Sequence, residues 1–247
     1  LYIAPEHGEA DADRDLDIVS YRQLVAHPHV GYLLISQLTE YPAAVAQAVA
    51  EHHERLDGSG YPRALHGSGL SPLGRLLAVT EAALNALRGP YDHLLHASVA
   101  LRAVPGEFDL AWVGRISQAA SRQPAHEAVL PHEDIQARLN ALGEVLSTAQ
   151  TNVDRLLGEA RHDGLRAALE LSHHLLQRLR VGWNESGLWN PQALASGDAA
   201  EVEALEDELY FRLRGVRRAA LLRGGTLPPA EAGTLDALCE SLEMGRG

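Results

Sequence analysis

The sequence predicts an all-α protein, and three observations support this fold class. Apolar residues recur every three or four positions through most of the 247 residues, which is the spacing of one helix face. No segment alternates in polarity in the way that a half-buried strand does. The 3 Trp, 7 Tyr and 2 Phe are too few to fill a core, so Leu, Ala and Val must fill it, as in helix bundles.

Two helices are expected near the N-terminus. The first covers about residues 20–39, with Pro28 near its first turns. The second covers residues 42–53, because a proline suits its first position and Ala and Val follow at helical spacing. Its last turn would carry His52 and His53.

A third helix is expected at residues 71–88, where Ser71 would cap the N-terminus and Pro72 would follow it. Residues 121–134 contain two Pro and two His and form the best candidate for a linker. Beyond it, helices are expected at about 134–160, 165–181, 199–223 and 229–243, with a loop at 182–198.

The helix expected at about residues 134–160 has a coiled-coil-like seam, because its apolar residues step by three or four. Such a seam packs either into the core of its own chain or against a second copy. A packed core and a homodimer through the C-terminal helices are therefore both open. The seam consists of Ile135, Leu139, Leu142, Leu146, Ala149, Val153 and Leu156.

The composition excludes several classes of function. The net charge of −12 argues against DNA or RNA binding, although a metal can supply local positive charge for a small nucleotide. All 21 basic residues are Arg, which excludes lysine-dependent chemistry in this chain. The single cysteine, Cys239, leaves no disulfide framework and favours a cytoplasmic location. No apolar run approaches the ~20 residues that span a bilayer, and no signal peptide is visible.

The residues most informative about function lie between His52 and Pro62. They read His-His-Glu-Arg-Leu-Asp-Gly-Ser-Gly-Tyr-Pro. Neutral imidazole is the commonest metal ligand in proteins, and carboxylates suit hard divalent ions and bound water. Packing alone rarely produces two adjacent imidazoles and two carboxylates in so short a run. The run therefore predicts a metal site.

This run, H-H-E-x-x-D-G-x-G-Y-P, closely resembles the signature of HD-GYP domains. These are all-helical, metal-dependent phosphodiesterases that hydrolyse the bacterial second messenger cyclic di-GMP. Residues 27–31 are similar to the family's H-P-x-x-G segment, and residues 75–81 to its R-I-L-A-V-A-D segment. The resemblance covers about residues 1–105. It implies the C-terminal portion of an HD-GYP-like domain, an HD-domain-like helical bundle, at residues 1–120, followed by a helical C-terminal region at 134–247.

The resemblance also implies two or three divalent metal ions, Fe or Mn, as cofactors. Both histidines of the family's pair and the histidine of H-P-x-x-G bind metal, which implies His52, His53 and His27 as ligands. For His27 an exposed loop histidine is the alternative. The terminal Asp of the third segment is a ligand in the family, and Glu81 stands in its place. Glu81 would be either a ligand in an altered site or an exposed side chain.

Six further residues of the run would support the site. The two carboxylates would accept the second N–H of a ligand histidine, and the two glycines would adopt positive φ. The Tyr-Pro pair would either contact a GGDEF-domain cyclase, the partner that the resemblance implies, or only lock the loop. These residues are Glu54, Asp57, Gly58, Gly60, Tyr61 and Pro62.

Departures from the family pattern leave two functions open. The catalytic His-Asp pair is absent from the chain as given, and because the chain begins at Leu1 we expect an upstream segment. The basic residues of the family's R-P-Y-[RK] segment hold substrate phosphates, but this segment reads Gly-Pro-Tyr-Asp at 89–92, so Arg88 is the candidate substitute. The resemblance thus implies a cyclic-di-GMP phosphodiesterase. The alternative is a catalytically degenerate regulatory module that acts through contacts with GGDEF proteins.

Overall fold

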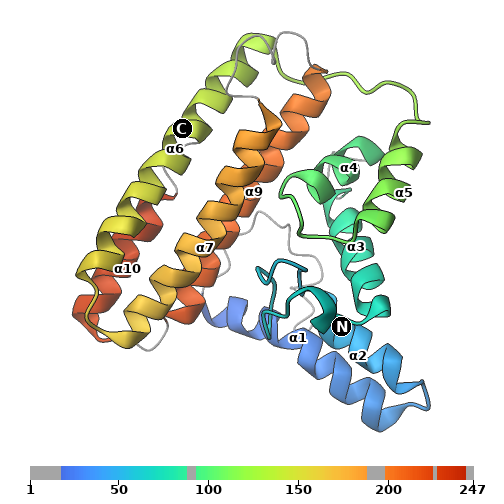
Figure 1. The fold of residues 1–247 in the computed structure, drawn as a ribbon, viewed down its shortest axis with the longest axis horizontal. Helices are drawn as coiled ribbons and strands as arrows, with labels where there is room; N and C mark the ends of the chain where they lie inside the picture. Colours follow the sequence, from blue (N-terminus) through green and yellow to red (C-terminus); the bar gives the residue numbers. More distant parts are fainter. Residues whose placement is uncertain (1–17, 88–92, 188–197, 225–226, 243–247) are drawn as a thin grey trace. The chain divides into compact units, whose positions relative to one another are not determined.

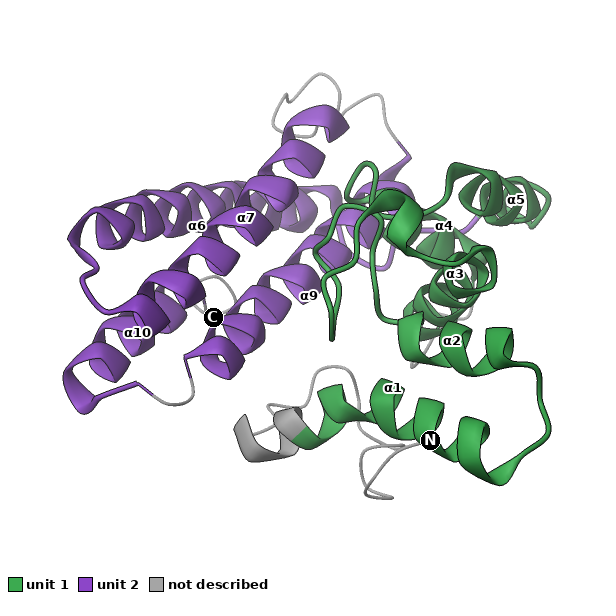
Figure 2. Cartoon of the chain, turned by 60° about the horizontal axis from the view of Figure 1, so that its bottom comes forward, with its two compact units in different colours: residues 1–125 green, residues 126–247 purple. Residues whose placement is uncertain are grey.

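The computed structural model describes residues 18–87, 93–187, 198–224 and 227–242. Within these ranges every regular element is a helix, apart from an isolated β-bridge between Asp57 and His66, which confirms the all-α class (Figure 1). The chain divides into two compact units, residues 1–125 and residues 126–247 (Figure 2). None of the helices described is long and apolar enough to cross a membrane.

Unit 1 is a series of helices in which each packs on the next in the chain. A long loop, which includes a short 3₁₀ helix at Gly67–Gly69, joins the second helix to the third. The last three helices share a small apolar core that includes Val79, Leu101 and Phe108. The helices are α1 (Ile18–Leu38), α2 (Ala43–Glu51), α3 (Pro72–Ala86), α4 (Leu94–Arg102) and α5 (Leu110–Ala120).

The structure corrects the expected helices of unit 1 in three respects. Pro28 lies in the middle of α1 and not near its first turns. Helix α2 ends at Glu51, two residues before the expected end, so His52 is its C-cap residue and His53 lies in the following turn. Helices α4 and α5 were not predicted. Asp109 is a residue type preferred at N-caps and could have indicated α5, whereas His93, which caps α4, is not.

A buried carboxylate joins α2 to α3. Glu51 is 0% exposed, and its Oε2 accepts hydrogen bonds from the Ser71 N–H (2.9 Å) and hydroxyl (2.6 Å). Its Oε1 accepts one from the Gln47 side chain at 2.9 Å. The Ser71 oxygen in turn accepts the Gly74 N–H at 3.0 Å, which confirms Ser71 as the N-cap. The end of one helix therefore determines the start of the next.

Unit 2 is a helix bundle whose core includes the predicted seam. Every seam residue is at most 7% exposed, so the seam packs within its own chain and does not present a surface for a homodimer. Helix α7 packs against α6 and α9, and α10 packs against all three. The helices are α6 (His132–Glu159), α7 (Asp163–Ser186), α9 (Ala199–Arg223) and α10 (Pro229–Ser241).

The expected loop at 182–198 is wrong over its first residues, because α7 continues to Ser186. Trp183 packs against the core cluster of Ile135, Leu139 and Val202, and this tertiary contact extends the helix. Gly187, with φ of 70°, then ends it as a left-handed cap. Residues 188–197 lie outside the part of the chain that the structure describes.

The Gly74→Ala variant is expected to destabilise unit 1 by about 2–4 kcal/mol. A Cβ at this position would lie 2.1 Å from Glu51 Oε2, so the buried carboxylate would have to leave its partners. Urea denaturation followed by circular dichroism measures the change. The matched control is Gly114→Ala in α5, where a Cβ meets no atom within 4 Å. That variant should be more stable by about 0.5–1 kcal/mol, and an equal effect of both variants would contradict the prediction.

Candidate metal centre

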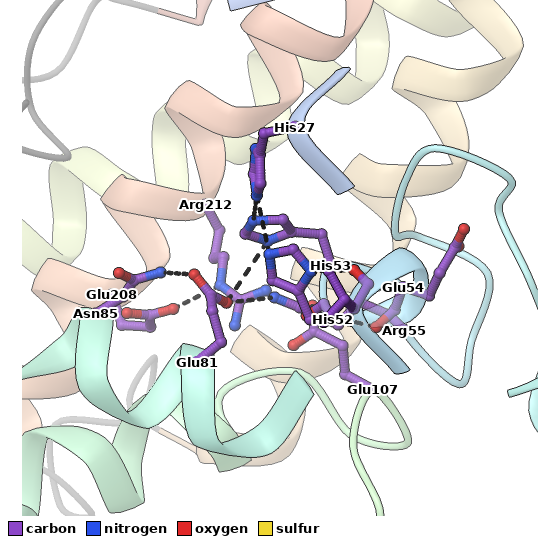
Figure 3. Close-up of polar contacts among 11 residues, drawn as sticks. His27, His52, His53, Glu54, Arg55, Glu81, Asn85, Glu107, Glu208 and Arg212 are labelled. Carbon is purple, nitrogen blue, oxygen red and sulfur yellow. Dashed lines mark hydrogen bonds and ion pairs between the residues drawn. The ribbon is translucent and has the colours of Figure 1, made fainter. Parts of the chain in front are cut away.

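Three histidines from three consecutive segments of unit 1 meet at one point (Figure 3). His27 comes from the middle of α1, His52 from the C-cap of α2 and His53 from the turn that follows. His27 Nε2 lies 2.9 Å from His52 Nε2 and 3.1 Å from His53 Nε2. All three histidines of the sequence prediction are therefore brought together, and the alternative of an exposed loop position for His27 is wrong, since His27 is buried in a helix.

The orientation of two of these rings is determined by backbone carbonyls. His27 Nδ1 lies 2.5 Å from the Leu24 carbonyl, and His52 Nδ1 lies 2.6 Å from the Val49 carbonyl. Because a carbonyl only accepts, each Nδ1 must carry the proton and each Nε2 must present a lone pair. Two lone pairs 2.9 Å apart repel each other, so the arrangement suits a cation that both nitrogens bind.

The spacing of the nitrogens also fits a metal ion. Ligand nitrogens at 2.0–2.1 Å from one ion and at right angles lie about 3.0 Å apart. The observed separations of 2.9 and 3.1 Å agree with this value.

Burial keeps the imidazoles neutral. It lowers the pKa of His27, and it lowers the pKa of His52 to about 4 although the hydrogen bond to Val49 opposes this change. It also lowers the pKa of His53, with the positive charges of His52 and Arg55 contributing in the same direction. Neutral imidazole is the form that binds metal, so no proton has to be displaced near pH 7.

Glu81 on α3 faces this histidine cluster. Its Oε2 lies 3.6 Å from His53 Nδ1, its other oxygen accepts a hydrogen bond from Asn85, and its side chain is 20% exposed. The alternative of a simple exposed side chain is therefore wrong. Glu81 lies beside Nδ1 of His53, whereas Nε2 of the same ring faces His27, so the group of atoms that could hold one ion consists of the three imidazoles. Imidazole nitrogen suits Zn and Fe, and a nearby carboxylate suits Mn.

Arg55 is a component of the site that sequence reasoning missed. Its guanidinium group donates to the carbonyls of His52 (3.3 Å) and Glu54 (3.0 Å) and lies 3.8 Å from Glu81 Oε2. It also lies 3.8 Å from the buried Glu107 carboxylate. The position of Arg55 within the signature run indicates that it lies near the site. Nothing in the sequence, however, pairs it with Glu107, 52 positions away.

The two carboxylates of the signature loop fold the loop. Glu54 is 0% exposed and accepts the backbone N–H groups of Arg63 (2.7 Å) and Leu65 (2.9 Å). The expectation that it accepts a histidine N–H is therefore wrong. Asp57 accepts the N–H (3.0 Å) and hydroxyl (2.6 Å) of Ser59, two residues on. Both carboxylates thus accept hydrogen bonds from backbone N–H groups of the loop, which would otherwise need other partners.

The two signature glycines are required for different reasons. Gly58 has φ of +81°, as expected. Gly60 does not have positive φ, so that expectation is wrong for it. A Cβ at Gly60 would lie 2.5 Å from backbone atoms of His53, Glu54 and Arg55. Gly60 therefore allows two backbone segments to approach closely.

The Tyr-Pro pair lies beside the histidines. The Tyr61 ring stacks on the His53 ring, with 4.6 Å between the centroids and 19° between the planes, whereas Pro62 is exposed. Tyr61 thus limits the movement of one imidazole of the histidine cluster. Arg88, the candidate phosphate-binding residue, lies outside the described residues.

Comparisons with known proteins agree with this site. Residues 10–106 match the family model of the HD domain. Over 128 residues, 49% of this chain, the sequence is 27% identical to 3'3'-cGAMP-specific phosphodiesterase 3 of Vibrio cholerae serotype O1. The matched part spans 27% of that relative's length. No solved structure matches the chain. Residues 10–106, which carry the three histidines and the signature loop, are therefore similar to HD domains and are HD-GYP-like.

Proposed function

We propose that unit 1 is the metal-binding part of a metal-dependent phosphodiesterase that hydrolyses a cyclic dinucleotide. The HD domain match and the cyclic-dinucleotide relative support a metal-dependent nucleotide phosphodiesterase. The observation that carries the proposal is the meeting of three neutral imidazoles, at Nε2 separations of 2.9 and 3.1 Å from His27, beside Glu81. The signature favours cyclic di-GMP as substrate, with linear di-GMP or GMP as products. The relative's name makes 3'3'-cGAMP the substrate to compare with it.

The proposed ligands are His27, His52, His53 and Glu81, and the proposed ions are Fe or Mn, two or three in number. A divalent ion bound by these residues would supply Lewis acidity and lower the pKa of water. Arg55 lies 3.8 Å from Glu81 and limits the excess negative charge that Glu81 and Glu107 bring to the site.

Arg88 is the proposed contact to a substrate phosphate. We place the protein in the cytoplasm, in agreement with Cys239, its single cysteine, which is buried.

Replacing any of His27, His52 or His53 by Ala should lower the Mn²⁺ affinity of the apoprotein by at least about 100-fold, because each substitution removes one nitrogen ligand. Turnover of cyclic di-GMP and of 3'3'-cGAMP should fall with it. Metal content by mass spectrometry and product formation by chromatography measure the two effects.

The matched control for these variants is His29→Ala. His29 lies on the same helix as His27, two residues further on, but its side chain is exposed. This variant should keep metal and turnover. Wild-type affinity in the His27→Ala variant would contradict the proposed ligand set.

Metal binding should depend only weakly on pH between 7.5 and 6.0. The pKa of His52 is lowered to about 4, and those of His27 and His53 are lowered as well, so protons compete with the metal only in more acidic solution. Three histidines with the ordinary pKa of 6.5 would lose roughly 50-fold in affinity over this range. We expect a loss of less than about fivefold in Mn²⁺ titration calorimetry. A loss of tens of fold would show that the imidazoles are not held neutral.

A second candidate function is a regulatory module that hydrolyses nothing and binds a GGDEF-domain protein. Two observations favour it: a guanidinium group already lies beside the Glu81 carboxylate, and Pro62 of the signature is exposed. If this function is correct, Pro62→Ala should abolish the capture of a GGDEF protein, whereas His52→Ala should not. The measurement is a pull-down with purified proteins. Capture that is lost equally in both variants, or absent from the wild type, would argue against the regulatory module.

A further inference from the structure

We infer that Pro28 is a positioning residue for the metal centre. It leaves the Leu24 carbonyl open to His27 Nδ1 and so directs His27 Nε2 towards His52 and His53. The inference rests on the proposed metal-binding function and identifies what orients one of its ligands.

Pro28 occupies an unfavourable position for a proline. It lies in the middle of the 21-residue helix α1 and is buried. A proline within a helix has no N–H to donate to the carbonyl four residues earlier, and its ring pushes that carbonyl away from the helix axis. Here the affected carbonyl belongs to Leu24. An α-helix that accepts this loss requires another donor for the carbonyl.

His27 is that donor. Its Nδ1 lies 2.5 Å from the Leu24 oxygen, and its Nε2 points in the opposite direction, towards the other two imidazoles (Figure 3). With an ordinary residue at position 28, the backbone N–H would bind Leu24 and hold the carbonyl along the helix axis. His27 Nδ1 would then compete with the backbone N–H of residue 28 for the Leu24 carbonyl.

His52 supports this interpretation, because its Nδ1 also binds a backbone carbonyl that has no helical N–H partner. Here the carbonyl lacks that partner for a different reason. His52 Nδ1 lies 2.6 Å from the Val49 carbonyl, which is also three residues earlier in the chain. Since α2 ends at Glu51, Val49 lies in the last turn, where carbonyls lack helical N–H partners. A helix end opens the carbonyl for His52, and a proline does so for His27 within a continuing helix.

The packing of the two helices makes this orientation effective. Gly31 lies one turn after His27, on the same face of α1. A Cβ at Gly31 would lie 2.7 Å from Val49 Cγ1, so the absence of a side chain lets α1 approach the segment that anchors His52. The two carbonyl-anchored rings then meet with their Nε2 atoms 2.9 Å apart.

The Pro28→Ala variant tests the inference. Its new N–H should bind Leu24, weaken the bond to His27 Nδ1 and allow the proton to move to Nε2. Long-range ¹H–¹⁵N NMR of the histidine-labelled apoprotein reports this tautomer, and the His27 signals are assigned with His27→Gln. We expect wild-type His27 to be protonated at Nδ1 and the variant to be a mixture of tautomers. Mn²⁺ affinity should fall roughly 10- to 100-fold, as for other groups that orient a ligand, while circular dichroism shows the helix content retained.

Two further proteins separate the missing N–H from other effects of the substitution. Pro72→Ala removes an exposed proline at the first turn of α3, where an N–H has no helical partner, and should change neither tautomer nor affinity. A semisynthetic protein with an ester in place of the residue-28 amide has neither the N–H nor the proline ring, and should restore the Nδ1-protonated form.

The outcomes distinguish this inference from the proposed function. A Pro28→Ala protein with the wild-type tautomer would overturn the role of Pro28, and so would an ester protein that behaves like Pro28→Ala. If the variant changes the tautomer but the wild type binds no Mn²⁺, the positioning role stands and the proposed metal-binding function fails.

Discussion

The buried Glu51 carboxylate is the interaction on which the rest of the site depends. It joins the end of α2 to the N-cap of α3 through two hydrogen bonds to Ser71. His52 and His53 directly follow Glu51, and Glu81 lies further along α3. The separation between the imidazoles and the carboxylate of Glu81 is therefore set by a side chain that binds Gln47, Arg63 and Ser71. Burying this charge is tolerable because Ser71, Gln47 and Arg63 all contact it.

Backbone carbonyls, and not carboxylates, orient the histidines whose anchors are best defined. A carbonyl cannot take up a proton near neutral pH, so it specifies the Nδ1-protonated tautomer of the neutral ring. The acidic residues of the signature are therefore not needed to orient His27 and His52. Glu54 and Asp57 instead hold the loop backbone in the conformation that places Tyr61 on His53. These two carboxylates thus stabilise the loop, and the group of atoms that could hold an ion consists of imidazole nitrogens.

The all-α class and the meeting of His27, His52 and His53 could be predicted from the sequence, because both are written in local patterns. Periodicity indicates helices, and the signature identifies the histidines. The partners of these residues could not be predicted. Glu51 binds Ser71 20 positions away, and Arg55 contacts Glu107, and such pairs exist only once the helices have packed. Gly60 illustrates the same limit: the sequence identified the glycine correctly but could not show that backbone crowding, not positive φ, requires it.

The histidines that meet in unit 1 come from positions that are distant in the chain, and His27 and His52 are 25 residues apart. An ion bound to both would close a loop of that length and would restrict the unfolded chain in the manner of a cross-link. This chain has a single cysteine and cannot form an internal disulfide. A metal bound at the histidine cluster would therefore cross-link α1 and α2 as a disulfide does. Unlike a disulfide, this cross-link would form and break with the supply of metal.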